Sequence, residues 1–64
     1  MILMENVNIA VGVERTKVEY INVSVHYFGD EKMAQIRRKK DGKEEVIAIF
    51  SLYTLQYIRR IDIE

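Results

Sequence analysis

The sequence predicts an all-β fold, a small and strongly bent antiparallel meander or barrel of about five strands with one short helical or 3₁₀ turn. An Asp-Gly pair lies between two strand-like segments, and apolar and polar residues alternate with a period of two near the N-terminus. A third segment, residues 46–50, is apolar at every position, as in strands covered on both faces. At 64 residues the chain is expected to form one domain, residues 1–64.

The Asp41-Gly42 pair predicts a β-hairpin, because a two-residue type I′ turn needs positive φ at both central positions. Counting outward from this turn fixes the register of the two strands. The predicted pairs are Lys40–Lys43, Lys39–Glu44, Arg38–Glu45, Ile36–Ile47, Ala34–Ile49 and Met33–Phe50. Opposite charges and apolar side chains then face each other, which stabilises an antiparallel pair.

A second turn is predicted at Gly29-Asp30, since a type II′ turn takes glycine at its first central position. Its register pairs Phe28 with Glu31, Val25 with Ala34 and Val23 with Ile36. Together the two turns place six apolar residues on one face, Val23, Val25, Ala34, Ile36, Ile47 and Ile49. We expect this face to form the core.

The sequence of the N-terminal half predicts two strands and a bend. Residues 7–13 alternate in the manner of a half-buried strand, and Gly12 within them indicates a bulge or a close backbone approach. The polar residues 14–17 indicate a tight connection. The following strand, about residues 18–28, changes the phase of its apolar pattern, so a bulge or bend is expected near Tyr20-Ile21.

The sequence of the C-terminal segment allows two interpretations of its secondary structure. The favoured one is a helical or 3₁₀ turn over Leu52 to Gln56 followed by a strand from about Tyr57. The alternative is a helix continuing to Arg60 over a four-stranded sheet, an α+β fold. In the favoured reading, the order of elements is similar to that of SH3-like and Sm-like small barrels, an architectural analogy that implies no function.

Composition excludes several kinds of site. The chain has no cysteine and only one histidine, so disulfides, zinc–thiolate sites and multi-histidine metal sites within one chain are excluded, and no cofactor or metal is expected. Zero formal net charge argues against broad electrostatic binding to nucleic acid. The apolar residues 1–4 are too few for a membrane span or signal peptide, so we expect a soluble, cytoplasmic protein with no membrane partner. A chain this small is expected to gain stability from oligomerisation or from a larger partner.

Basic residues form the one charged cluster with a functional interpretation. The candidate anion-binding residues are Arg37, Arg38, Lys39, Lys40, Lys43, Arg59 and Arg60. The competing interpretation is a solvated tip that fixes the hairpin register, because Arg38 and Lys39 face Glu45 and Glu44.

Catalytic chemistry is not predicted. His26 falls beside Met33 and Phe50 with no carboxylate, nucleophile or second histidine as cross-strand neighbour, so a structural role is expected. No Walker-type loop, G-x-S-x-G or H-E-x-x-H motif is present. The protein is therefore predicted not to be an enzyme.

Three hypotheses for function remain. The first is a protein-interaction module that self-associates, with contact residues Met1, Ile2, Leu3, Phe50, Tyr53 and Tyr57. The second is an oligomer that binds a nucleotide or single-stranded nucleic acid between basic tips and tyrosines. The third is a small inhibitor, encoded by a phage or mobile element, that blocks or sequesters a host component.

Overall fold

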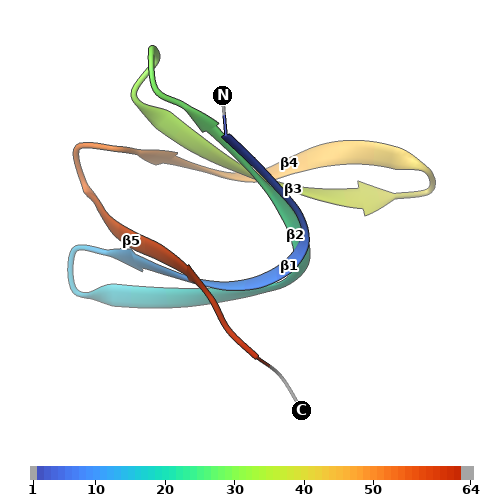
Figure 1. Cartoon of the computed structure of the whole chain (residues 1–64), viewed down its shortest axis with the longest axis horizontal. Coiled ribbons are helices and arrows are strands. Elements are labelled where there is room, and N and C mark those ends of the chain that lie inside the picture. The colour runs from blue at the N-terminus through green and yellow to red at the C-terminus, as the bar shows by residue number, and fades with distance from the viewer. Residues whose placement is uncertain (1, 63–64) are drawn as a thin grey trace.

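The computed structural model describes residues 2–62, which form one five-stranded antiparallel sheet. The strands are β1 (Ile2–Val13), β2 (Thr16–Phe28), β3 (Met33–Lys40), β4 (Lys43–Ser51) and β5 (Leu55–Arg60). Their order across the sheet is β4-β3-β2-β1-β5 (Figure 1). The predicted all-β class is confirmed, and the α+β alternative is wrong because no helix occurs in residues 2–62. For the same reason this part of the chain holds no helical segment suited to crossing a membrane.

Two bulges bend the sheet. The register between β1 and β2 shifts between Met4 and Val7, where β1 has one extra residue, and shifts again where β2 has one. Asn6 and Asn22 lie at these points with φ of 53° and 55°, a left-handed conformation that asparagine tolerates better than most residues. The amide of Asn22 donates a hydrogen bond to Oδ1 of Asn8 at 2.9 Å. The predicted bend near Tyr20-Ile21 is therefore confirmed, and Figure 1 shows β1 and β2 curving through it together.

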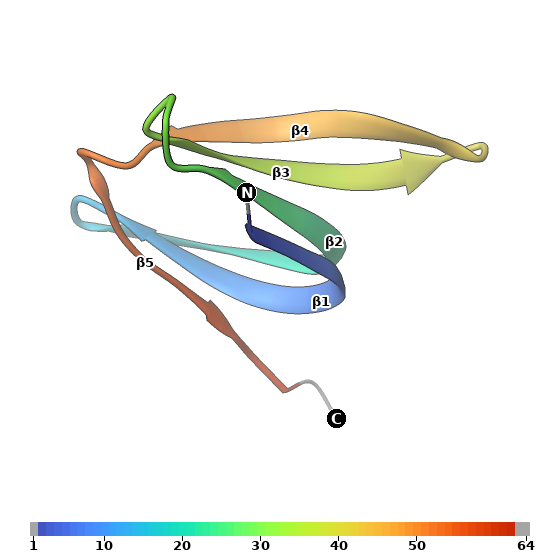
Figure 2. The ribbon, with the colours of Figure 1, turned by 45° about the horizontal axis from the view of Figure 1, so that its top comes forward.

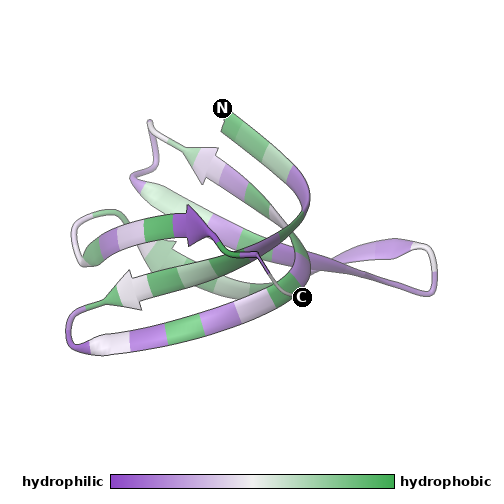
Figure 3. Ribbon diagram, turned by 60° about the horizontal axis from the view of Figure 1, so that its bottom comes forward, coloured by the Kyte–Doolittle hydropathy of each residue, from purple (hydrophilic) through white to green (hydrophobic). Residues whose placement is uncertain are grey.

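The core lies on the inner face of this bend. Its buried apolar residues are Val7, Ile9, Val11, Val23, Val25, Ala34 and Ile36, whereas the buried Ala10 alternates with Ile9 and Val11 and lies on the other face. Tyr20 and Phe50 pack against it edge to face, with ring centroids 6.4 Å apart, and so join the start of β2 to the end of β4. The projecting end of the β3–β4 hairpin is hydrophilic (Figure 3).

The hairpin register changes part of the way along β4. The three pairs nearest the turn are as predicted, but the register shifts after the Arg37–Val46 pair, and Ile36 then pairs with Ala48. The predicted pairs Ile36–Ile47, Ala34–Ile49 and Met33–Phe50 are therefore wrong. Ile47 and Ile49, expected in the core, are 37% and 60% exposed. Since β4 is apolar at both parities from 46 to 50, its hydrophobic pattern could not reveal the bulge.

The connection between β2 and β3 is longer than predicted. Phe28 pairs with Met33 across a four-residue loop, and Val25 pairs with Ile36, so the predicted two-residue turn is wrong. Lys32 closes the loop at φ 54°, and its carbonyl accepts a hydrogen bond from the Leu52 amide at 2.9 Å. The predicted pairs Phe28–Glu31 and Val25–Ala34 are each displaced by two residues, and the predicted pair Val23–Ile36 is wrong because Ile36 pairs with Val25. A displacement of two preserves faces, which is why Val23, Val25, Ala34 and Ile36 are buried as predicted.

The C-terminal segment forms a turn and then a strand, in the predicted order, but the turn is not helical and ends before Leu55, so the predicted helical or 3₁₀ turn over Leu52 to Gln56 is wrong. Residues 52–54 make the turn, in which the Tyr53 amide donates to Ser51 Oγ at 3.2 Å and the Thr54 amide to the Ser51 carbonyl at 3.2 Å. Strand β5 starts two residues before the predicted position and pairs with β1. Gly12 pairs with Tyr57, whose ring occupies the place that a Cβ at Gly12 would take, which confirms the predicted close approach.

Candidate interaction surface

A row of side chains crosses the outer face of the sheet from β1 to β4. The strand registers pair Leu3 with His26, His26 with Gln35 and Gln35 with Ile49. Paired residues in adjacent strands share a face, so these four side chains lie side by side. The middle of the row is covered, with His26 only 8% exposed, whereas Leu3 and Ile49 at its ends are exposed.

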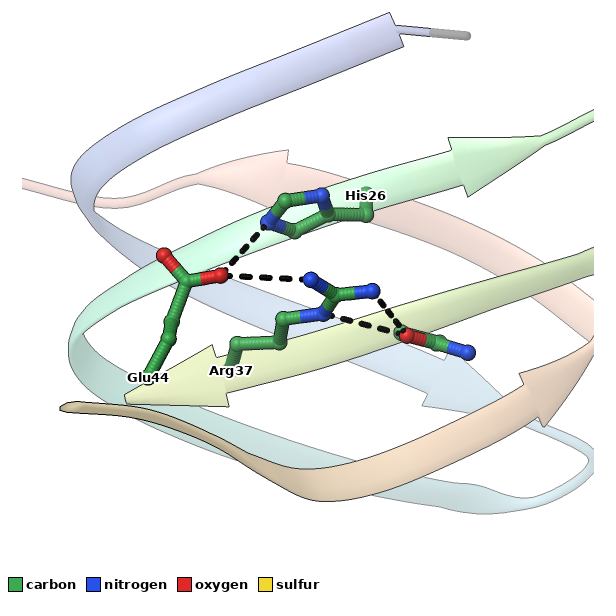
Figure 4. Close-up of polar contacts among 4 residues, drawn as sticks. His26, Arg37 and Glu44 are labelled. Atoms are coloured by element: carbon green, nitrogen blue, oxygen red, sulfur yellow. Dashed lines mark hydrogen bonds and ion pairs between the residues drawn. The ribbon is translucent and has the colours of Figure 1, made fainter. Parts of the chain in front are cut away.

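Four polar residues, which we call the polar cluster, lie on this face: His26, Gln35, Arg37 and Glu44 (Figure 4). Arg37 Nη1 donates to Glu44 Oε1 at 3.2 Å, while its Nε and Nη2 donate to Gln35 Oε1 at 3.1 and 2.6 Å. The Glu44 oxygen also lies 3.4 Å from His26 Nε2. The guanidinium of Arg37 is therefore held by acceptors from β3 and β4, and β4 is fixed near its start.

The loop between β2 and β3 brings the polar cluster together. Its extra length moves β3 by two residues against β2, so His26 lies beside Gln35 instead of Met33. Glu44 pairs in register with Lys39, but its carboxylate reaches the diagonal neighbour Arg37. The predicted neighbours Met33 and Phe50 are therefore wrong. The cross-strand neighbours of His26 are Leu3 and Gln35, neither of them a carboxylate, and the nearby carboxylate of Glu44 comes from a strand that is not paired with β2.

The His26 ring is enclosed on several sides. It stacks on Phe28 with ring centroids 6.3 Å apart and an interplanar angle of 14°, and the Arg37 guanidinium lies 6.0 Å from the centroid of the same Phe28 ring. Its buried Nε2 makes no hydrogen bond within residues 2–62, so the contact with Glu44 is an ion pair only when the imidazole is protonated. Ser24 precedes it by two residues on the same face, and no hydrogen bond connects the two side chains in the described chain. Ser24 and His26 therefore do not form the hydrogen-bonded pair in which a histidine activates a serine hydroxyl as a nucleophile.

Metal binding has no support from the described residues. Residues 2–62 contain no group of three or more histidine, aspartate or glutamate side chains arranged to hold an ion. Elsewhere in the sheet, burial raises the pKa of the Tyr27 hydroxyl above its ordinary value of 10.0.

Strand β4 presents exposed apolar side chains at an edge of the sheet. Val46, Ile47 and Ile49 are 45%, 37% and 60% exposed. The sequence predicts that the second face of this strand is covered by the N-terminal strand, the C-terminal segment or another subunit. In the structure, the exposure of Val46, Ile47 and Ile49 shows that neither terminal strand covers this face. Strands β1 and β5 also lie beyond β3 and β2 in the sheet order, so neither pairs with the free edge of β4. These side chains are available to another polypeptide.

The structure does not bring the predicted basic residues into one site. Lys39, Lys40 and Lys43 are exposed around the hairpin tip, which projects from the rest of the molecule (Figure 1). Arg38 is also exposed and donates to the Ile21 carbonyl at 3.4 Å. Arg59 and Arg60 lie on β5 at the other edge of the sheet. With Arg37 engaged in the polar cluster, a single copy offers two separate basic regions.

The predicted contact residues are also dispersed. Ile2, Leu3 and Tyr53 are 65%, 43% and 82% exposed. Phe50 and Tyr57 are half-buried, the first against the core and the second over Gly12, and Met1 lies outside the described residues. The contact residues predicted from the sequence do not include Val46, Ile47 and Ile49, although the continuous apolar run of residues 46–50 is a signal for them.

Comparisons with known proteins assign this chain to no family. No protein-family model matches it, and no curated protein or solved structure shows significant similarity. The polar cluster and the exposed edge of β4 are therefore the features from which a function can be proposed.

Proposed function

We propose that the protein is a non-enzymatic interaction module that self-associates and binds a protein partner through the edge and outer face of β4. The observation that supports this proposal is the exposure of Val46, Ile47 and Ile49 on an edge strand. Such a strand offers main-chain hydrogen-bonding groups and apolar side chains together, the combination used in strand addition. Fully burying one such side chain contributes roughly 1.5–3 kcal/mol.

The polar cluster supports a binding role for β4. Glu44, at the start of the strand, is held by Arg37 and lies at ion-pair distance from His26. An edge fixed in this way loses less conformational freedom when a partner binds, which favours affinity. The burial of His26 also supports a non-enzymatic role, because a substrate would have little access to its ring.

Native mass spectrometry of the purified protein over a range of concentrations tests this proposal, since it reports copy number and any retained polypeptide. We expect the wild type to carry at least one further polypeptide and Ile49→Lys to be a monomer with an unchanged circular dichroism spectrum. Thr16→Lys introduces the same charge at an exposed position of β2 and should behave as the wild type. A bare wild-type monomer, or an Ile49→Lys variant that associates normally, would contradict the proposal.

The exposed tip favours a second candidate, an oligomer that binds an anionic ligand. Lys39, Lys40 and Lys43 form no ion pair within the described chain and are free to contact phosphate. Binding of a single-stranded oligonucleotide should then weaken steeply as salt increases, and further in an Arg38→Ala, Lys40→Ala double variant. Salt-insensitive binding would reject this function.

A further inference from the structure

The sheet has two open edges. In the order β4-β3-β2-β1-β5, β4 and β5 each have a strand neighbour on one side only within residues 2–62. Figure 2 shows them as the outermost strands, on opposite sides of the sheet. The free edges are nine and six residues long, and their unpaired amides and carbonyls can pair with another chain.

The two edges carry opposite charge patterns along their lengths. After Lys43, strand β4 has Glu44-Glu45 and continues with the apolar residues 46–50. Strand β5 starts with Leu55, includes Tyr57 and Ile58, and ends in Arg59-Arg60. In an antiparallel arrangement, the acidic start of β4 lies beside the basic end of β5, and the apolar parts of both strands lie beside each other.

The charges involved form no ion pair within residues 2–62, although Arg38 lies opposite Glu45 in the register of β3 and β4. Glu45, Arg59 and Arg60 are exposed, and the ion pairs formed by residues 2–62 do not include them. The Arg59 guanidinium lies 4.7 Å from the centroid of the Tyr57 ring, a cation–π contact that holds it along β5. This contact leaves the N–H groups of the guanidinium free to donate to a carboxylate. These groups are therefore available to a partner with the complementary pattern.

We propose that the free edge of β4 in one copy pairs antiparallel with the free edge of β5 in a second copy. The inference rests on the proposed self-association and specifies its interface. Because the contact uses two different surfaces, the pair of copies keeps one free β4 edge and one free β5 edge for further copies. The assembly therefore either closes into a ring or extends as a filament.

Other pairings of the same edges match less well. An antiparallel β4–β4 contact centred on the strand places Glu45 opposite the apolar end of the second copy. A β5–β5 contact likewise places Arg59 and Arg60 opposite Leu55 and Gln56. A parallel β4–β5 contact sets the acidic start of β4 beside the apolar start of β5. Of these four arrangements, the antiparallel β4–β5 contact is the one that brings opposite charges together.

Charge exchange at the two edges tests the inference. The variants are Glu45→Arg, Arg60→Glu and the two combined, each measured by sedimentation and native mass spectrometry. Both positions are exposed and lie outside the polar cluster, and thermal unfolding checks that each variant remains folded. We expect each single change to weaken association roughly tenfold, because a favourable charge pair becomes a repulsive one.

Recovery of association is the decisive result. The combined variant should associate as the wild type, and so should a one-to-one mixture of the two single variants, since alternating copies restore an opposite-charge pair at every contact. Failure of both to recover would overturn the inference. So would normal association of Arg60→Glu, which would indicate a β4–β4 contact.

The failure of this inference can be distinguished from the failure of the proposed function. If the wild type associates and every variant associates equally well, the self-associating module is retained and the β4–β5 contact is rejected. A wild-type protein that remains a bare monomer up to roughly millimolar concentration, the weak limit of specific association, would reject both.

Discussion

His26 Nε2 on β2 lies 3.4 Å from Glu44 Oε1 on β4, although the two strands are not neighbours in the sheet. Strand β3 lies between them, and its Arg37 donates to the same oxygen at 3.2 Å. A single carboxylate oxygen therefore lies between side chains of two other strands, and its hydrogen bond from Arg37 holds the start of the edge strand in place. The Glu44 side chain remains 33% exposed, so water screens these interactions and limits their contribution to stability.

Glu44→Gln should lower the free energy of unfolding by about 0.5–1 kcal/mol, because the amide retains the shape of the side chain and removes its charge. Urea unfolding at low salt measures the change, which should shrink at high salt. Glu45→Gln is the matched control, since Glu45 forms no ion pair in the described chain. Equal loss in the two variants would contradict the assigned role of Glu44.

Gly12→Ala should destabilise the fold by about 1–3 kcal/mol, because the added methyl group overlaps the Tyr57 ring and forces it away. Thermal or urea unfolding measures this loss. Gly29→Ala adds the same methyl group where nothing lies within 4 Å, and it should change stability by less than about 0.5 kcal/mol. In a Tyr57→Ala background, the effect of Gly12→Ala should largely disappear, and its persistence would show that the ring is not the cause.

Asn22→Val should destabilise the fold by about 1–2 kcal/mol, since a β-branched residue strongly disfavours the left-handed φ of 55° at this bulge. Asn22→Gly accepts the same φ without steric conflict and keeps the amide that donates to Asn8. Chemical unfolding of both variants gives the comparison. Equal stabilities for valine and glycine would show that the left-handed conformation does not constrain this position.

Alkaline pH should destabilise the protein through Tyr27. Burial raises the pKa of its hydroxyl above 10.0, so as the pH rises past that value the unfolded chain ionises first and gains relative stability. The contribution of the neutral Tyr27 hydroxyl to the free energy of unfolding is therefore present in full below pH 10, and it is lost as the pH rises through the folded-state pKa. Unfolding midpoints measured on either side of pH 10 should fall less steeply in Tyr27→Phe.

Tyr53→Phe is the control for that measurement, because Tyr53 is 82% exposed and the substitution removes a hydroxyl that burial does not affect. Its alkaline fall in stability should match that of the wild type. An unchanged slope in Tyr27→Phe would indicate that other groups cause the alkaline effect.

The turn chemistry of the sequence predicted the hairpin tip and the all-β class. Asp41-Gly42 fixes the first pairs because few dipeptides suit a type I′ turn. The phase change after Tyr20 similarly predicted the bend that Asn22 makes. These features depend on residues close together in the chain, which is where sequence patterns are informative.

The polar cluster could not be predicted because it depends on two register changes. Gly29-Asp30 suits a two-residue turn, yet the chain uses a four-residue loop tied to the Leu52 amide by a contact distant in sequence. The bulge after Val46 lies in a strand that is apolar on both faces, so nothing in its pattern marks the extra residue. For this reason the sequence predicts Ile49 in the core, whereas the structure exposes 60% of it on the edge strand.

Strand β5 completes the sheet by pairing with β1, so that Ile9 lies opposite Arg60 near the other end of the chain. Contacts between such distant residues form late and slow folding. A ribosome-bound chain that lacks residues 55–60 would expose the edge of β1 that β5 otherwise covers, including the backbone around Val11. An uncovered edge of this kind can pair with another chain, so protection by a chaperone would matter until β5 has docked.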